Sequence, residues 1–201
     1  MKLQDVLKEM PYLHPGEMPI DKKLDGSYSA ATLKRDFKRV GTIGDAEVLI
    51  HNTHRFVIVI TENQTAAGRY QPIFRVEFKA NVEIAVDIGL SKAKMLQVNS
   101  VVVAKHEQGK QLASSVYKTL VDSGFVIVSD NTQFDPGAAL WKKLAADSAY
   151  TTIVVDVDHG SYKDIAGTVI QYDGKNINDR EIWSHGSDFD GVHRVLVLYK
   201  H

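Results

Sequence analysis

The sequence predicts a mixed fold, α/β or α+β, whose mostly antiparallel sheet contains one parallel strand pair. In residues 47–88, short stretches of apolar residues alternate with polar ones, which is typical of strands joined by hairpins. In residues 95–158, strand-like runs alternate with two amphipathic helical patterns. A strand, a helix and a second strand in succession usually form a parallel pair with a right-handed crossover.

The composition fits one globular domain. The chain has 201 residues, of which 44% are hydrophobic and 24% are charged. Its net charge of -1 gives no reason to expect nucleic acid or an anionic membrane as a partner. Cysteine is absent, which excludes disulfides and thiolate chemistry and fits a reducing compartment. Without a signal peptide or an apolar run long enough to span a bilayer, the expected location is the cytoplasm.

The N-terminal region divides into an extension and the start of the domain. Residues 1–28 hold three of the five prolines, so we expect an irregular extension there, and a single domain over 29–201. Residues 29–40 predict a helix, because Ser29 is a suitable N-cap and three apolar residues recur on one face. Those apolar residues are Leu33, Phe37 and Val40. The basic residues Lys34, Arg35, Lys38 and Arg39 lie on the other sides, as a solvated face or as a docking patch for an acidic partner.

The other elements follow from apolar periodicity. Helices are expected over 108–122 and about 136–147, the second with Pro136 in its first turn. Residues 159–192 are polar and rich in Gly and Asp, which indicates a long excursion or hairpin. The expected strands are 47–52, 55–61, 71–80, 95–105, 125–130, 151–158 and 194–200, and residues 82–88 form either another strand or a continuation of 71–80.

A short polar loop, residues 105–110, connects the apolar strand 95–105 to the helix that follows. The carboxyl ends of such strands are where α/β proteins bind ligands. Backbone N–H groups at a helix start lack helical partners, and the helix dipole favours an anion there. The loop therefore predicts a phosphate-binding site, with a plain strand-to-helix turn as the alternative.

This order of elements and this loop resemble the GNAT superfamily of acyl-CoA N-acyltransferases. That family's phosphate-loop signature is Arg or Gln, two residues of any type, Gly, any residue, and Gly or Ala. The sequence Gln108-Gly109-Lys110-Gln111-Leu112-Ala113 matches its first and last positions, and Gln111 stands where the family has glycine. The segment Gly137-Ala138-Ala139-Leu140-Trp141-Lys142-Lys143 resembles the family's second conserved helix. Residues 108–117 and 129–145 look especially like GNAT-like proteins encoded by bacteriophages.

The resemblance implies a sheet whose parallel pair splays apart. It also implies transfer of an acetyl or other acyl group from acyl-CoA to an amine, with acetyl-CoA as cosubstrate and no metal. A homodimer is common in that superfamily, and a viral origin would place the protein in the host cytoplasm. The implied coenzyme contacts are Val102, Val103, Ala104, Gln108, Gly109, Lys110, Gln111, Leu112 and Ala113. Gln133 is a further candidate, either in the pocket or on a surface loop.

The catalytic residues of the family are replaced in this chain. Its usual acid is a tyrosine, where this chain has Trp141, and its usual base is a glutamate on or near the central strand. An indole N–H cannot act as an acid near neutral pH. Tyr117 and Asp130 are the substitute candidates, with core packing and turn formation as their respective alternatives.

These replacements keep a second hypothesis open, namely a catalytically silent GNAT-like protein that binds a host or partner protein. Fold alone does not decide between the two. His51 and His54 are spaced as the start of a metal site, but the sequence offers no third ligand, so no metal is expected.

Overall fold

The computed structural model describes residues 24, 26–85, 87–130, 135–164, 166–183 and 194–200. Most of the predicted N-terminal extension, and the candidate Gln133, lie outside these residues.

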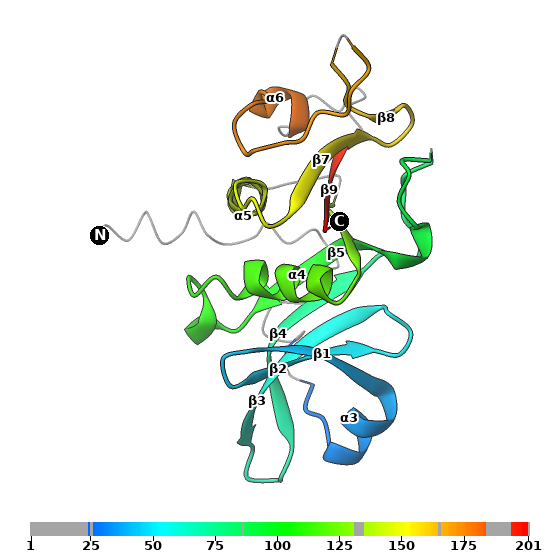
Figure 1. Ribbon diagram of the computed structural model, residues 1–201. Helices are drawn as coiled ribbons and strands as arrows, with labels where there is room; N and C mark the ends of the chain where they lie inside the picture. Colours follow the sequence, from blue (N-terminus) through cyan, green and yellow to red (C-terminus); the bar gives the residue numbers. More distant parts are fainter. Residues whose placement is uncertain are drawn as a thin grey trace, which may run out of the picture.

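The described chain forms a nine-stranded mixed sheet in the order β1-β2-β3-β4-β5-β6-β9-β7-β8 (Figure 1). Only β5 and β6 pair in parallel, and every other pair is antiparallel, so the predicted α+β sheet is confirmed. The strands are β1 (Phe37–Ile43), β2 (Ala46–His51), β3 (Phe56–Gln64), β4 (Tyr70–Phe78), β5 (Met95–Val103), β6 (Val126–Val128), β7 (Thr151–Asp156), β8 (Gly160–Ser161) and β9 (Arg194–Tyr199). The helices are α3 (Ala30–Asp36), α4 (Leu112–Asp122), α5 (Asp135–Ala145) and α6 (Asp179–Ile182), with 3-10 turns η2 (Lys92–Lys94) and η3 (Lys105–Glu107).

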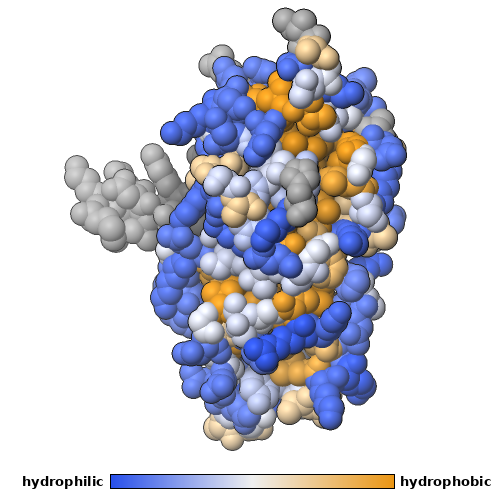
Figure 2. Space-filling view, viewed as in Figure 1, coloured by the Kyte–Doolittle hydropathy of each residue, from blue (hydrophilic) through white to orange (hydrophobic). Residues whose placement is uncertain are grey.

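Alternation along the central strands gives the sheet two apolar faces. In β3, Val57 and Val59 belong to the large cluster that contains the buried residues of α4 and α5. The neighbouring Ile58 and Ile60 belong to a separate cluster with Leu33 of α3 packed against it. Figure 1 shows α4 passing in front of the sheet. In the same view, Figure 2 shows apolar areas of the surface that are interrupted by hydrophilic residues.

The prediction of a helix over 29–40 is wrong after Asp36. Ser29 does cap α3, since its side chain accepts a hydrogen bond from the Thr32 N–H. From Phe37 onward, however, the backbone pairs with β2 and forms β1. The spacing of the apolar residues fits a helix, but pairing with a neighbouring strand satisfies the same backbone groups and decides the structure.

The strand predicted over 82–88 is also wrong among the residues described there. Ile84 is buried, as an apolar residue of a strand would be. Its neighbours bond irregularly, because the Glu83 N–H donates to the Gln97 side chain and the Ala85 N–H donates to Val157. The segment therefore contributes to the core without extending the sheet.

The edge strand β1 contains a bulge and approaches α4 closely. Its register with β2 shifts between Arg39 and Gly41, so Val40 is an extra residue, and the Ser123 hydroxyl donates to the Val40 carbonyl at 2.8 Å. A Cβ added to Gly41 would lie 2.5 Å from Cγ2 of Thr119 on α4. Glycine at this position therefore allows β1 and α4 to pack.

The predicted excursion after β7 is described as far as Trp183, apart from residue 165, and is held to the domain by several contacts. The Tyr172 N–H donates to the Thr152 carbonyl at 2.7 Å, and the Tyr172 side chain is fully buried. Lys142 of α5 forms an ion pair of 2.5 Å with Asp179. Gly174 has a φ of +91°, and a Cβ there would lie 2.7 Å from the Lys142 carbonyl oxygen. The excursion therefore packs directly on the α5 backbone.

Candidate functional site

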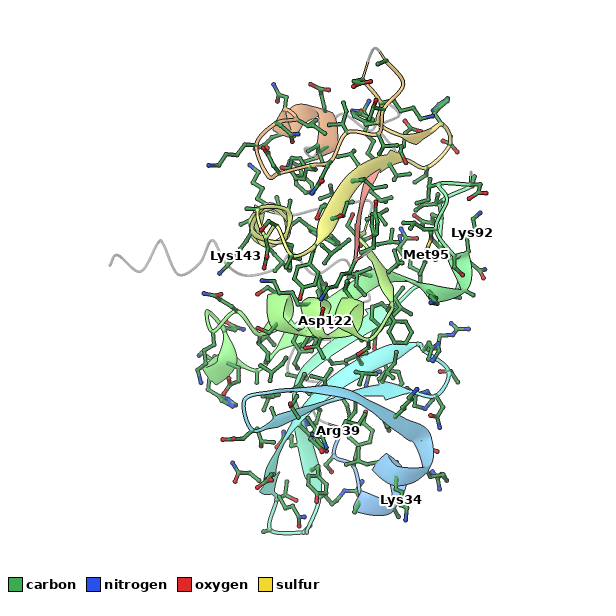
Figure 3. All side chains as sticks on the ribbon, in the orientation of Figure 1. Lys34, Arg39, Lys92, Met95, Asp122 and Lys143 are labelled. Carbon is green, nitrogen blue, oxygen red and sulfur yellow. The ribbon has the colours of Figure 1, made fainter. Side chains whose placement is uncertain are left out.

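β5 separates from β6 partway along its length. The two strands pair only over Met95–Gln97, the first of which is labelled in Figure 3. Beyond this point β5 continues against β4 alone, and Asn99 is an extra residue between the partners of Phe78 and Glu77. Because a bulge bends its strand, this one accounts for the divergence. Among the described residues, no strand covers the other edge of β5 beyond Gln97.

The uncovered edge carries backbone groups that do not bond to β4. The Ala104 N–H donates to the Ile73 carbonyl at 2.8 Å, so by strand alternation the N–H and C=O of Val103 point away from β4. The Val103 carbonyl accepts a hydrogen bond of 3.3 Å from the Gln108 side chain. The Val101 side chain on this stretch is 37% exposed. The uncovered edge of β5 and the following loop are therefore in direct contact.

The loop turns into α4 through two residues with positive φ. Gly109 has a φ of +78°, and Gln111 has a φ of +62° and a ψ of 22°, in the left-handed region. No described residue accepts a hydrogen bond from the backbone N–H of Gly109, Gln111, Leu112 or Ala113. These donors gather at the start of α4, where the helix dipole also favours an anion.

The charges around the loop are mixed. The Lys110 ammonium lies 3.0 Å from the Glu107 carboxylate, and the His106 ring lies 3.6 Å from the same carboxylate. Lys105 is exposed on the same turn. Lys105 and Lys110 together outnumber the single carboxylate of Glu107, which is suitable for a doubly charged phosphate group.

Gln111 occupies a backbone conformation that glycine prefers. For other residues the left-handed region costs roughly 1–2 kcal/mol. We expect Gln111→Gly to raise the free energy of unfolding by up to about 1 kcal/mol, because the relieved strain exceeds the added entropy of the unfolded chain. Denaturant unfolding of the purified variant measures this change.

Gln108→Gly is the matched control, since Gln108 has a φ of -62° and no strain of this kind to relieve. It should lower stability by roughly 0.5–1 kcal/mol. If both variants lost stability equally, the left-handed conformation of Gln111 would not be strained in solution.

Asp130 lies just past β6, at the divergence, and is part of a polar cluster. The Lys79 ammonium bonds to Asp130 at 2.9 Å and to Glu83 at 2.8 Å. Gln97 is fully buried, and its side chain accepts from the Glu83 N–H and donates to the Glu83 carboxylate and the Ser129 carbonyl. These contacts join β4, β5 and the end of β6.

The polar cluster lies on the face of the sheet opposite α4. On β5, Leu96 and Val98 pack into the main apolar core together with α4, whereas Met95 packs into a second apolar cluster with Ile84. By alternation, Gln97 shares the face of Met95. Burial is the largest effect on the Lys79 ammonium and lowers its pKa, but the bonds to Glu83 and Asp130 together raise that pKa above its ordinary value.

Tyr117 and Trp141 lie inside the main core. Tyr117 is 1% exposed and Trp141 is 2% exposed, and their rings are 5.9 Å apart. Burial, with the nearby Asp130 charge, raises the pKa of Tyr117 well above its usual value. Such a phenol is a weaker acid than a free one. The acid role of Tyr117 stays a prediction, and its placement supports packing.

The structure brings most of the predicted coenzyme contacts together at the open edge of β5. Val103 and Ala104 are half-buried there, Gln108 to Gln111 are exposed, and the side chains of Val102 and Leu112 point into the protein. Sequence reasoning missed Lys79 and Glu83, because no local motif connects either residue to Asp130.

Two hollows on the described surface lie away from this loop. One of about 440 Å³ is lined by residues of α3 and β2–β4, including Leu33, Glu47 and Tyr70. Another of about 340 Å³ lies between β1 and the end of α4, beside His54 and Phe125.

The His51 ring stacks on the Phe56 ring, with 4.7 Å between the ring centroids. Across the described chain, no group of three or more His, Asp or Glu side chains is arranged to hold a metal ion.

Comparison of the chain with protein-family models, with curated proteins and with solved structures finds no match. Among the described residues, none of the helices has both the length and the apolar character needed to cross a bilayer.

Proposed function

We propose that the chain binds an acyl-coenzyme A and transfers its acyl group to an amine. The observation that supports this best is the contact between the loop and the uncovered edge of β5, since four N–H groups at the end of the loop and the start of α4 have no acceptor among the described residues. The loop offers a seat for the coenzyme's diphosphate, and the strand edge offers hydrogen-bonding groups for the amides of its pantetheine arm.

The loop accounts for the diphosphate end of the proposed site. The loop offers four backbone N–H donors, those of Gly109, Gln111, Leu112 and Ala113. The dipole of α4 adds the equivalent of about half a positive charge at the same place. Lys110 adds an ammonium that is 61% exposed and pairs only with Glu107 among the described residues, so it is available to a phosphate. The left-handed Gln111 gives the loop the backbone conformation that a glycine would favour at this position of the family signature.

The divergence of β5 and β6 accounts for the reacting end. An arm that follows β5 from the loop toward Gln97 brings its thioester near Ser129 and Asp130. The amine nitrogen attacks the carbonyl carbon, a carbon–nitrogen bond forms, and the carbon–sulfur bond breaks. Asp130 accepts the proton of the amine, and the coenzyme thiolate leaves and takes up a proton from solvent.

A silent GNAT-like protein that binds a partner protein is the second candidate. Three observations favour it: Trp141 replaces the family's acid and is buried, Tyr117 is buried as well, and Asp130 is paired with Lys79. Each reduces the groups that are free to transfer protons during catalysis.

Calorimetric titration with acetyl-CoA and with coenzyme A tests the proposal. We expect micromolar binding that weakens roughly tenfold or more in Gly109→Pro, because proline cannot adopt the φ of +78°. Gly68→Pro, at a φ of +66° in the β3–β4 turn, is the matched control and should bind normally. Lys110→Glu reverses one charge without changing the backbone and should also weaken binding.

Absence of binding by the folded wild-type protein at millimolar coenzyme would overturn the acyltransferase proposal. The same result would favour the partner-binding candidate. Equal binding by wild type and Gly109→Pro would place the coenzyme elsewhere on the chain.

A further inference from the structure

We infer that Lys79 is itself an acyl acceptor, and that the chain acylates this lysine from bound acyl-CoA. The inference rests on the proposed function, since it requires the thioester to lie at the divergence of β5 and β6. Lys79 is then a site of covalent modification, and the substrate is an amine held within the protein.

The backbone places Lys79 beside the last residue of β5 that pairs with β6. The Lys79 N–H donates to the Gln97 carbonyl at 2.8 Å, on the β4 side of β5. Its side chain then crosses β5 and reaches Asp130, which follows β6. The amine therefore spans the point at which the two parallel strands separate, where the proposed arm ends.

The amine is partly shielded and has a proton acceptor beside it. The Lys79 side chain is 20% exposed, so it is shielded without being enclosed. Asp130, at 2.9 Å, is in position to accept a proton from the ammonium. Glu83 also holds the amine, at 2.8 Å, and the buried Gln97 side chain bonds to both the backbone N–H and the carboxylate of Glu83.

The reaction is balanced by groups already named. The Lys79 ammonium gives one proton to Asp130, and the neutral nitrogen attacks the thioester carbon. The carbon–nitrogen bond forms, the carbon–sulfur bond breaks, and the coenzyme thiolate takes the proton from Asp130. The products are an amide at Lys79 and free coenzyme A, with the second ammonium proton released to solvent.

Acylation would change the charge of the site. The amide carries no positive charge, so Glu83 and Asp130 would lose the cation that lies between them. The carboxylates would then attract a second, external amine more strongly. Since the pKa of Lys79 is raised, little neutral amine is present at pH 7, and the rate of self-acylation should increase steadily with pH toward that pKa.

Lys200 provides a matched comparison within the chain. Its ammonium pairs with Asp122 at 2.8 Å and is 51% exposed, compared with 20% for Lys79. The pair joins the end of β9 to the last residue of α4, the opposite end of the helix from the loop (Asp122 is labelled in Figure 3). Uncatalysed acetylation by free acetyl-CoA would favour the more exposed Lys200, so preference for Lys79 indicates transfer from a bound coenzyme.

The test is incubation of the full chain with acetyl-CoA carrying an isotopically labelled acetyl group, followed by intact-mass and peptide mass spectrometry. We expect one acetyl group at Lys79, at least about tenfold ahead of Lys200, at a rate that saturates with acetyl-CoA. Asp130→Asn should slow labelling about 10²-fold without changing the coenzyme affinity measured by calorimetry. Lys79→Arg should remove the labelled peptide and keep the positive charge.

The outcomes separate this inference from the proposed function. Coenzyme binding without preferential labelling of Lys79 overturns the inference and leaves the proposed function standing. Absence of coenzyme binding overturns both. Labelling of Lys79 that is undiminished in Gly109→Pro also overturns the inference, because the transfer would then not need the loop. The wild-type mapping decides the question even if a variant fails to fold.

Discussion

Gly174→Ala is expected to lower the free energy of unfolding by about 3 kcal/mol. Two costs add at this position: a φ of +91° that an alanine adopts only under strain, and a Cβ placed 2.7 Å from the Lys142 carbonyl oxygen. The contacting atom belongs to the backbone of α5, so it cannot move aside as a flexible side chain would. Denaturant unfolding monitored by circular dichroism measures the loss.

Gly167→Ala separates the two costs. Gly167 lies in the same excursion with a φ of +83°, but a Cβ there would meet nothing within 4 Å. This variant should lose only the conformational share, about 1 kcal/mol. Equal losses in the two variants would mean that the excursion does not pack against α5 in solution.

Gly41→Ala is expected to cost about 2 kcal/mol, because the new Cβ would lie 2.5 Å from Cγ2 of Thr119. Relief requires β1 and α4 to move apart, or Thr119 to leave its preferred rotamer and lose the 2.9 Å bond from its hydroxyl to the Ser115 carbonyl. Thermal and denaturant unfolding of the single variant measure the cost.

Thr119→Ser is the rescuing change. It removes Cγ2 and keeps the hydroxyl, and the next nearest Thr119 atom lies 3.9 Å from the added Cβ. In a double-mutant cycle, Gly41→Ala in the Thr119→Ser background should therefore cost less than about 0.5 kcal/mol. A cost unchanged by Thr119→Ser would show that some other contact limits the approach of β1 to α4.

Periodicity predicted the elements whose burial repeats along one helix face or strand. Leu112, Val116 and Leu120 recur every four residues and are all buried in the main core. Leu33, Phe37 and Val40 have a similar spacing, yet Phe37 and Val40 belong to β1, because pairing with β2 outweighs a weak local preference. The sequence alone gives no measure of that pairing.

Part of the candidate site was likewise predictable from the sequence, and part was not. The loop was predictable, because its glycine and polar residues stand between a recognisable strand and helix. Gln111 was interpreted as a departure from a glycine position, and the structure adds that its backbone is nonetheless left-handed. Lys79, Glu83 and Asp130 meet only because β4 and β6 flank β5, and that arrangement depends on contacts between distant parts of the chain.

The bulge in β1 also bears on how the sheet ends. An edge strand with a regular row of free N–H and C=O groups is a template for strand addition by another molecule, and thus for aggregation. In β1, Val40 interrupts the row, its carbonyl already accepts a bond from Ser123, and Lys38 and Arg39 are exposed beside it. The side of the molecule where the sheet begins is thereby protected against edge-to-edge association.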